Sequence, residues 1–361
     1  MAARTLPLEI FARVLQHIRV PELPLLCRLN KSYQRVAERK LYSNLVLGDA
    51  NIAFHVCMAL LRNDGVRGAY VKRFWFWVDV RRTVSRVQLP MHFWKTIQLA
   101  LVTMTELKDL LIHDPIMTNT WILDPEELDD QHRFQLHHGK FRLVWDANLV
   151  AFLKTQTQLK YLMTLDATDI TQVESMPAGY LQALETYEGP LLVAAELLRC
   201  PRVTHMRVAV DEEVSPLLAE FIEGAVTLDT PLRSLHFSMI PEQFLGQALE
   251  ALTSEPKWCA GLKYLGVIPM PWVDHNIIHR HLLKLHNLQC IAFDVSHLEP
   301  APIEVMQRTL TLEMHIYCPS LHRVVFWFGP QINLWIYHQQ VWTSTGLHQF
   351  THADDHLWLS V

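Results

Sequence analysis

One short pattern of apolar and polar positions recurs along most of the chain. An apolar residue is followed by two arbitrary ones, and then two apolar residues flank a single arbitrary one. The phrase appears as VKRFWF from 71, LKDLLI from 107, LQALET from 181, VTHMRV from 203, LRSLHF from 232, LKYLGV from 262, LQCIAF from 288 and LHRVVF from 321. LKYLMT from 159 fits with one extra residue before Leu165, and the double gap before it predicts a hidden unit near 133, in RFQLHHGKF. Because alternate residues of a strand face opposite ways, each phrase predicts a half-buried strand.

Helical patterns lie between most of these strand phrases. Examples are FWKTIQLALVTM (93–104), PEQFLGQALEAL (241–252) and PIEVMQRTLTLEM (302–314), and proline opens several of them, as suits the first helical turn. One strand and one helix in roughly 20–35 residues is typical of a leucine-rich repeat, whose units stack because none buries its own apolar face. We therefore predict an α/β fold in which residues 71–329 form an irregular leucine-rich-repeat solenoid, a curved parallel sheet with helices on its convex side. A non-repeating α/β domain is the alternative.

The segments flanking the repeats have patterns of their own. Residues 114–132 are predicted to form a longer acidic loop, and a helix over roughly 51–62 is expected in the linker, residues 49–70. The tail over 330–361 carries Trp335, Trp342 and Trp358, and it is predicted to be a cap over the open edge of the last repeat.

The N-terminal residues 5–42 predict three short helices. Leu6, Ile10, Val14 and Ile18 recur every fourth residue, with Phe11 and Leu15 beside them, and this spacing makes one helix face apolar. Pro21 and Pro24 separate this helix from a second one, and Asn30 or Ser32 can cap a third. A module of fewer than about 40 residues rarely buries enough surface to be stable alone. Its apolar faces should therefore contact the rest of the chain, another protein, or both.

The same N-terminal residues carry a resemblance to a known family. LPLEIFARVLQHI followed by LPLLCRLNKSYQRVAERKLYSNLVL resembles the F-box motif, with Leu29-Asn30 and Tyr33 departing from its commoner pattern. The resemblance assigns residues 1–48 to the F-box. Together with the repeats that follow, it makes the chain similar to F-box proteins with irregular leucine-rich repeats from mushroom-type (basidiomycete) fungi. The resemblance implies a substrate-recognition subunit of an SCF-type cullin–RING ubiquitin ligase, which binds the ligase adaptor, and through it a cullin, with its N-terminal helices. The adaptor-binding residues implied are Leu6, Pro7, Ile10, Val14, Leu15, Leu23, Leu26 and Tyr33.

Composition and charge narrow the other functional classes. The net charge of −5 and the pI near 6.5 argue against a nucleic-acid or membrane-surface role, since both usually need a basic face. No apolar run reaches the roughly 18 residues of a membrane-spanning helix, and no secretory signal is recognisable, so we expect an intracellular protein, either cytoplasmic or nuclear. The six scattered cysteines form no CxxC pair and are expected to be reduced and mostly buried.

Candidate target-binding residues follow from the strand phrases. The residues between the apolar positions should point outward on the concave face, which is the usual binding surface of a solenoid. Trp, Tyr and Arg dominate protein–protein hot spots. These two rules select Trp75, Trp77, Tyr161, Tyr187, Arg207, Tyr264, Arg323 and Trp327 as contacts to a target protein. The competing interpretation is that the C-terminal tail crosses this face and buries these side chains.

Two alternative functions remain open at the level of sequence. The first is a leucine-rich-repeat interaction scaffold with no ubiquitin role, whose N-terminal helices are only a cap. The second is a hydrolase or metal enzyme in which Asp274, His275 and His279 converge, since the two histidines have helical i, i+4 spacing. The HExxH pattern, GxSxG, GxxxxGK[ST] and GxGxxG are all missing from the sequence, so no enzyme, cofactor or metal site is predicted.

Overall fold

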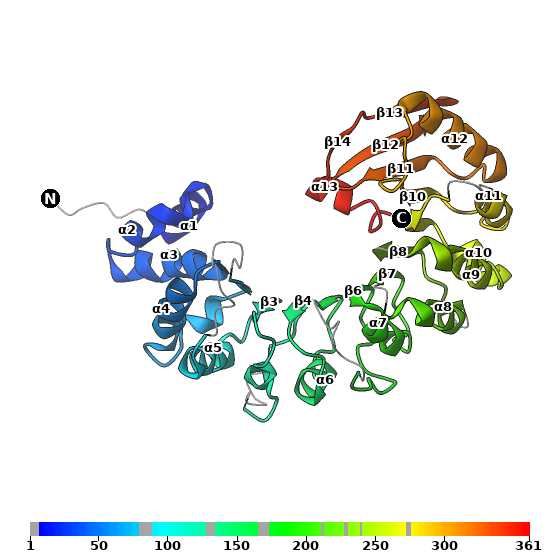
Figure 1. Ribbon diagram of the computed structural model, residues 1–361. Helices are drawn as coiled ribbons and strands as arrows, with labels where there is room; N and C mark the ends of the chain where they lie inside the picture. Colours follow the sequence, from blue (N-terminus) through cyan, green and yellow to red (C-terminus); the bar gives the residue numbers. More distant parts are fainter. Residues whose placement is uncertain are drawn as a thin grey trace. The chain divides into compact units, whose positions relative to one another are not determined.

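The structure is a computed structural model that describes residues 7–78, 89–127, 134–164, 173–210, 213–226, 230–238, 240–271 and 276–361 (Figure 1). It has a mixed α/β fold with mostly parallel strands. The chain forms two compact units, Met1–Glu174 and Ser175–Val361. Each unit is described by itself.

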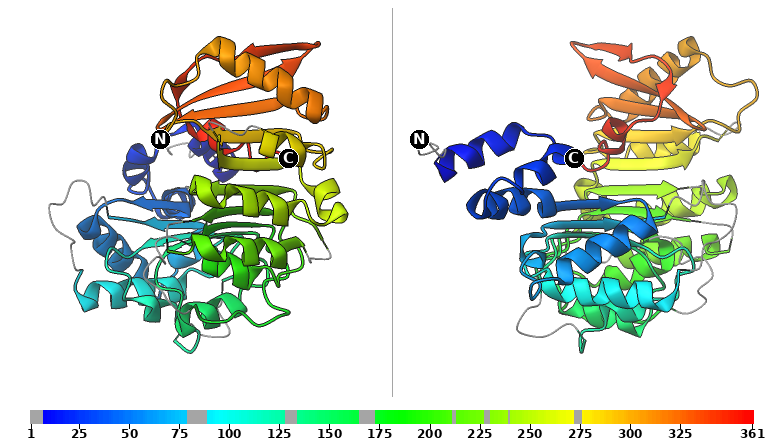
Figure 2. Two further views of the ribbon diagram at one scale, coloured as in Figure 1. Left: turned by 45° about the vertical axis from the view of Figure 1, so that its right-hand side comes forward. Right: turned by 90° about the vertical axis from the view of Figure 1, so that its left-hand side faces the viewer.

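Unit 1 begins with a helical module. Its elements are α1 (Leu8–His17), the short 3-10 helix η1 (Val20–Glu22), α2 (Leu23–Leu26) and α3 (Lys31–Ser43). Pro7 is the N-cap residue of α1, and Asn30 caps α3 by accepting a hydrogen bond from the backbone N–H of Tyr33 at 2.8 Å. The three predicted helices are therefore present, and α1 and α2 project from the rest of unit 1 in the right-hand view of Figure 2.

In the described part of unit 1, five parallel strands follow one another in chain order. They are β1 (Asn44–Leu47), β2 (Arg73–Phe76), β3 (Asp109–His113), β4 (His138–Arg142) and β5 (Tyr161–Thr164). The connecting helices are α4 (Ala50–Leu61), η2 (Gly68–Tyr70), α5 (Met91–Thr103), η3 (Thr120–Leu123) and α6 (Ala147–Lys154). Figure 1 shows α4, α5 and α6 on one face of these strands. The other face, called here the open face of unit 1, carries the residues between the apolar positions of each phrase.

Unit 2 repeats this arrangement and then changes strand direction. Six parallel strands are β6 (Thr186–Pro190), β7 (His205–Ala209), β8 (Ser234–Ser238), β9 (Tyr264–Pro269), β10 (Cys290–Asp294) and β11 (Arg323–Phe328). The helices between them are α7 (Leu191–Leu197), η4 (Ser215–Leu217), α8 (Leu218–Val226), α9 (Glu242–Leu252), α10 (Pro256–Gly261), α11 (Asn276–Leu282) and α12 (Glu304–Tyr317). After a turn at Gly329, β12 (Gln331–His338) pairs antiparallel with β11, followed by β13 (Val341–Ser344), β14 (His348–Gln349) and α13 (His352–Asp355).

The strand phrases predict the strands well. The predicted hidden unit near 133 corresponds to β4, and the linker helix to α4. The phrase assigned to 181 is wrong by three residues, because the apolar residues that enter the core are Leu184, Tyr187 and Gly189, and Tyr187 pairs with the inward-facing Met206. Strand β1 is also unexpected, since it lies inside the predicted N-terminal module, 1–48, and pairs with β2.

The regions flanking the repeats differ in detail from the prediction. Within the predicted acidic loop, the described residues fold around Asp114, which is fully buried and accepts hydrogen bonds from the backbone N–H groups of Ile116, Thr118 and Asn119. The predicted C-terminal cap adds strands to the sheet edge through β12, and its last residues then turn back onto the strands.

Candidate protein-binding surfaces

Helix α1 carries two neighbouring apolar stripes with opposite fates. Phe11 and Leu15 point inward and are 5% and 2% exposed. Ile10 and Val14 each precede one of these by a single residue, which rotates them about 100° around the helix axis, and they are 44% and 45% exposed. Pro7 is also exposed, whereas Leu6 lies outside the described residues. An exposed apolar stripe is expected of a helix that binds a partner, and it is not expected of a helix that serves only as a cap.

The inward stripe belongs to a small core of its own. Phe11, Leu15, Leu23 and Ala37 form this core, and Phe11 stacks on Tyr33 with ring centroids 4.2 Å apart. The prediction that Leu15 and Leu23 bind the adaptor is therefore wrong, because a side chain buried in the module cannot touch a partner. Leu26 and Tyr33 are half-buried and pack against the same core.

Further exposed apolar side chains lie near the stripe in sequence and were missed by the motif. Leu8, Val20, Leu25 and Leu29 are 42%, 55%, 65% and 60% exposed. Single exposed apolar residues need no explanation, but a series within residues 8–29 is unusual for a folded surface. The sequence signal that could have located Leu25 is its position next to Leu26 in a helix of four residues, where only one side can face the core.

Helix α3 attaches the module to the rest of unit 1. Glu38 forms an ion pair with Arg67 at 2.7 Å, and the Arg67 guanidinium lies over the ring of Tyr42 at 5.6 Å. The Lys40 ammonium donates hydrogen bonds to the carbonyl oxygens of Leu15 and Ile18 (2.9 Å for Ile18), so the C-terminal end of α1 is tied to α3. The module thus contacts its own chain through α3 and leaves the Ile10–Val14 stripe uncovered.

A cluster of aromatic and charged side chains occupies the open face of unit 1. The strand register places Arg73, Asp109, His138 and Tyr161 in one row, and Trp75, Leu111 and Lys140 in the next. The Asp109 carboxylate accepts hydrogen bonds from Arg73 Nε at 2.8 Å and from Trp75 Nε1 at 2.7 Å. Lys140 Nζ lies 5.3 Å from the Trp75 ring and 5.4 Å from the Tyr161 ring, within reach of cation–π attraction.

This cluster contains Trp75 and Tyr161, two of the residues selected from the sequence, and Trp77 is half-buried just beyond β2. Lys140 and His138 were missed because the hidden unit had no assigned register. Trp75, Tyr161 and Lys140 are each partly exposed, and such side chains are well suited to contact another protein.

Replacing Asp109 with alanine is expected to lower the free energy of unfolding by about 1–2 kcal/mol. The variant removes one charge-assisted hydrogen bond and leaves the indole N–H of Trp75 without its acceptor, but the exposure of Arg73 screens part of the ion pair. Urea denaturation would measure the loss. Glu106→Ala is the matched control, since Glu106 is exposed on the preceding turn and should change stability by less than about 0.5 kcal/mol. Equal effects of the two variants would contradict the assigned role of Asp109.

The corresponding face of unit 2 is covered by the end of the chain. Trp358 is 2% exposed and packs with Tyr264, Cys290 and Ala292. Its ring lies 5.1 Å from the Arg207 guanidinium, and Arg207 also pairs with Asp355. The residues 350–361, called here the C-terminal strap, therefore lie on the strand face that was predicted to be open.

Four of the predicted target contacts are used by this strap. Tyr264 is 3% exposed beneath it, Arg207 contacts Trp358 and Asp355, Arg323 donates a hydrogen bond to Ser360 Oγ at 3.3 Å, and Trp327 packs against Phe350 at 4.8 Å. A fifth candidate, Tyr187, is fully buried because of the corrected register. Tyr187 and Tyr264 are therefore wrong as target contacts, and the competing interpretation of a covering tail holds for unit 2.

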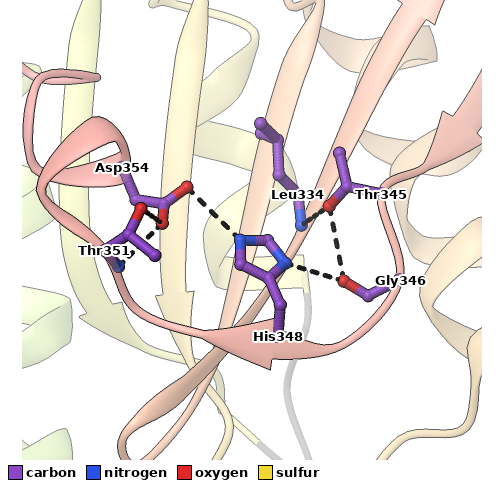
Figure 3. Close-up of polar contacts among 6 residues, drawn as sticks. All are labelled: Leu334, Thr345, Gly346, His348, Thr351 and Asp354. Carbon is purple, nitrogen blue, oxygen red and sulfur yellow. Dashed lines mark hydrogen bonds and ion pairs between the residues drawn. The ribbon is translucent and has the colours of Figure 1, made fainter.

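A polar clasp fixes the start of the strap (Figure 3). His348 Nδ1 lies 2.9 Å from the Gly346 carbonyl oxygen, and its Nε2 lies 3.4 Å from Asp354 Oδ1. The Gly346 carbonyl and Asp354 raise the pKa of His348, because both stabilise the protonated ring. Partial burial alone would raise the pKa of Asp354, but hydrogen bonds from the Thr351 hydroxyl and N–H, and the contact with His348, lower it. Both partners are charged between these two shifted pKa values, where the clasp is strongest.

The histidines of the metal hypothesis do not provide a described site. His279 is 7% exposed and stacks on Tyr317 at 4.3 Å, while Asp274 and His275 lie outside the described residues. Among the residues that the structure describes, no group of three or more His, Cys, Asp or Glu side chains could hold a metal ion. The cysteines are unpaired, and burial raises the pKa of Cys57 and of Cys290 to about 12, which leaves these thiols protonated at neutral pH.

Comparison with known proteins adds no relative to this picture: no family model matches the chain, and neither does any curated protein. Within the described ranges, no helix has both the length and the apolar character that a membrane crossing requires.

Proposed function

We propose that the chain is a substrate-recognition subunit of an SCF-type cullin–RING ubiquitin ligase, with an F-box module in residues 1–48 and an irregular leucine-rich-repeat solenoid behind it. The module would bind the ligase adaptor, and the repeats would bind a target protein. The action is positional, because holding a target near the catalytic subunits converts an encounter into an intramolecular step.

The observation that carries the proposal is the exposed apolar stripe of α1. A helix that only capped the first repeat would bury Ile10 and Val14 against it, yet both are more than two-fifths exposed while the rest of the module keeps its own core and its own attachment through α3. The recurring strand phrase, which coincides with a strand at every occurrence except the one assigned to 181, supports the repeat half of the proposal. The aromatic cluster at Trp75, Tyr161 and Lys140 is the open surface that we assign to the target.

The test is co-expression with the adaptor of cullin–RING ligases, followed by co-purification and measurement of the dissociation constant. Ile10→Ala/Val14→Ala is expected to weaken adaptor binding roughly 30- to 700-fold, since truncating two interface side chains forfeits about 2–4 kcal/mol. The variant should keep the stability of the wild type, because both side chains are exposed in the free chain.

A matched control truncates two exposed apolar residues that belong to unit 2 and not to the N-terminal module. Val305→Ala/Ile316→Ala on α12 removes side chains that are 71% and 74% exposed, and it should leave adaptor binding unchanged. If the folded wild-type chain does not bind the adaptor, the proposal is overturned and the scaffold interpretation is favoured. In that interpretation the module is only a cap, attached to the rest of unit 1 through Glu38 and Arg67.

A further inference from the structure

A pocket of about 340 Å³ lies beside the C-terminal strap in unit 2. Residues from each of the strands β6 to β11 line one side of it, and Phe350 and Asp355 of the strap line the other. Its volume is at the lower end of the range for small-ligand sites. None of the residues that line the pocket belongs to the module of α1–α3 or to the open face of unit 1.

The pocket contains more negative than positive charge. Its lining includes the carboxylates Glu188, Asp294 and Asp355 and a single guanidinium, that of Arg207. Arg207 already pairs with Glu188 at 3.2 Å and with Asp355. No described cation pairs with Asp294, whose Oδ1 accepts hydrogen bonds from the Ser296 N–H at 2.9 Å and hydroxyl at 2.6 Å. Its Oδ2 receives none from the described part of the chain.

A buried histidine offers a second polar atom in the same pocket. His236 is 5% exposed and lines the pocket, and its Nδ1 lies 3.0 Å from the Tyr264 hydroxyl. Its other ring nitrogen, Nε2, makes no hydrogen bond to any described residue. Burial, and then the nearby Arg207 charge, lower the pKa of His236 well below its usual value, so the ring is neutral. In the tautomer whose Nδ1–H donates to the Tyr264 hydroxyl oxygen, Nε2 keeps a lone pair that can accept a hydrogen bond from a ligand.

An aromatic wall completes the pocket. Trp327 is the strand neighbour of Asp294 in the register of β10 and β11, and its ring packs against Phe350 with centroids 4.8 Å apart. An indole next to an unpaired carboxylate suits a flat cation, since a guanidinium can stack on the ring while its N–H groups reach the carboxylate. An ammonium gains less from such a wall because its charge is compact and strongly hydrated.

We propose that this pocket binds a guanidinium group, presented by an arginine side chain of another protein. Asp294 Oδ2 and His236 Nε2 accept its N–H groups, and Trp327 provides the apolar wall. Asp355 and Phe350 make the site depend on the docked strap. Calling the arginine-bearing protein a ubiquitination target rests on the proposed function, whereas the binding itself does not.

The experiment titrates the full chain, without the adaptor, with a capped peptide, acetyl-Gly-Arg-Gly-amide, and follows heat or tryptophan fluorescence. The same peptide with citrulline in place of arginine has nearly the same shape and no charge, and it is expected to bind at least about tenfold more weakly, a difference of about 1.4 kcal/mol. Agmatine provides the guanidinium without a peptide. Binding of agmatine but not of the capped peptide would overturn the assignment to a protein side chain.

The variant that tests the site is Asp294→Asn. Asparagine keeps an oxygen for the Ser296 hydrogen bonds but removes the charge, so the fold is retained and arginine-peptide binding should weaken at least about tenfold. Glu250→Gln, on the exposed side of α9, is the matched control and should bind like the wild type. Equal binding of the arginine and citrulline peptides to wild type overturns the inference without any variant, as does an unchanged affinity of Asp294→Asn or no binding at millimolar peptide. Because the adaptor is absent, these results do not depend on the outcome of the co-purification test.

Discussion

Trp358→Ala is expected to lower the free energy of unfolding of unit 2 by about 3–5 kcal/mol, the range for removing a buried aromatic side chain. Trp358 is 2% exposed, although it is only three residues from the last residue of the chain. Its indole packs among His205, His236 and Arg207, with centroid distances of 6.5 Å and 6.3 Å to the two histidine rings. No other strap residue whose burial the structure describes is buried as deeply, so its loss should detach residues 350–361.

The reactivity of Cys290 provides a second readout for the same variant. Cys290 is fully buried, and it lies on the strand face beneath the strap, in one row with Tyr264 and Arg323. In Trp358→Ala a thiol reagent should reach Cys290 far faster than in the wild type, and the added Cys290→Ser change should abolish that signal. Cys200, at the end of α7, is the internal control and should stay unreactive. An unchanged unfolding free energy together with an unreactive Cys290 would mean that the strap does not cover this face.

The strap also explains why the target-binding residues were only partly predictable. The alternation within each strand phrase correctly placed Trp75, Tyr161, Arg207, Tyr264 and Trp327 on the face away from the helices, because period-2 patterning is a local property of the chain. Whether that face meets solvent is not local. In unit 2 it is decided by Phe350 and Trp358, which are distant in sequence and belong to a segment without strand patterning.

The register error at Tyr187 has a different cause. The phrase LQALET offered three apolar or small positions starting at Leu181, but Leu181 adopts a positive φ of 51°, outside the extended region of a strand. The strand therefore begins later and uses Gly189 as its third inward position, where an apolar search finds no side chain. Strand β1 was missed because NLVL follows α3 directly and was included in the predicted N-terminal module, 1–48, where no strand was expected.

The helices of the N-terminal module were predictable from the sequence, but the division of their apolar residues between core and surface was not. The motif identified the helices and the exposed pair Ile10 and Val14, but it also assigned Leu15 and Leu23 to the interface. Amphipathic spacing marks all apolar positions of a short helix, and it does not separate those that build the small core from those that remain outside. Truncating one core residue and one exposed residue of the same short helix tests this separation.

Leu23→Ala and Leu25→Ala are expected to have opposite consequences although they lie two residues apart in α2. Leu23 is fully buried in the four-residue core of the module, so its truncation should cost about 2–5 kcal/mol. A module of this size has little stability to lose. Residues 7–43 should therefore lose their protection from hydrogen exchange while the amides of β2–β5 keep theirs.

Leu25 is 65% exposed, and its truncation should change stability by less than about 0.5 kcal/mol and leave every protection factor intact. If the adaptor contacts this surface, Leu25→Ala weakens adaptor binding in a folded module, whereas Leu23→Ala abolishes it by unfolding the module. The two variants thus separate a side chain that touches the partner from one that shapes the surface. Loss of protection throughout unit 1 in Leu23→Ala would instead show that the module and the sheet unfold as one cooperative body, and that the helices act as a cap.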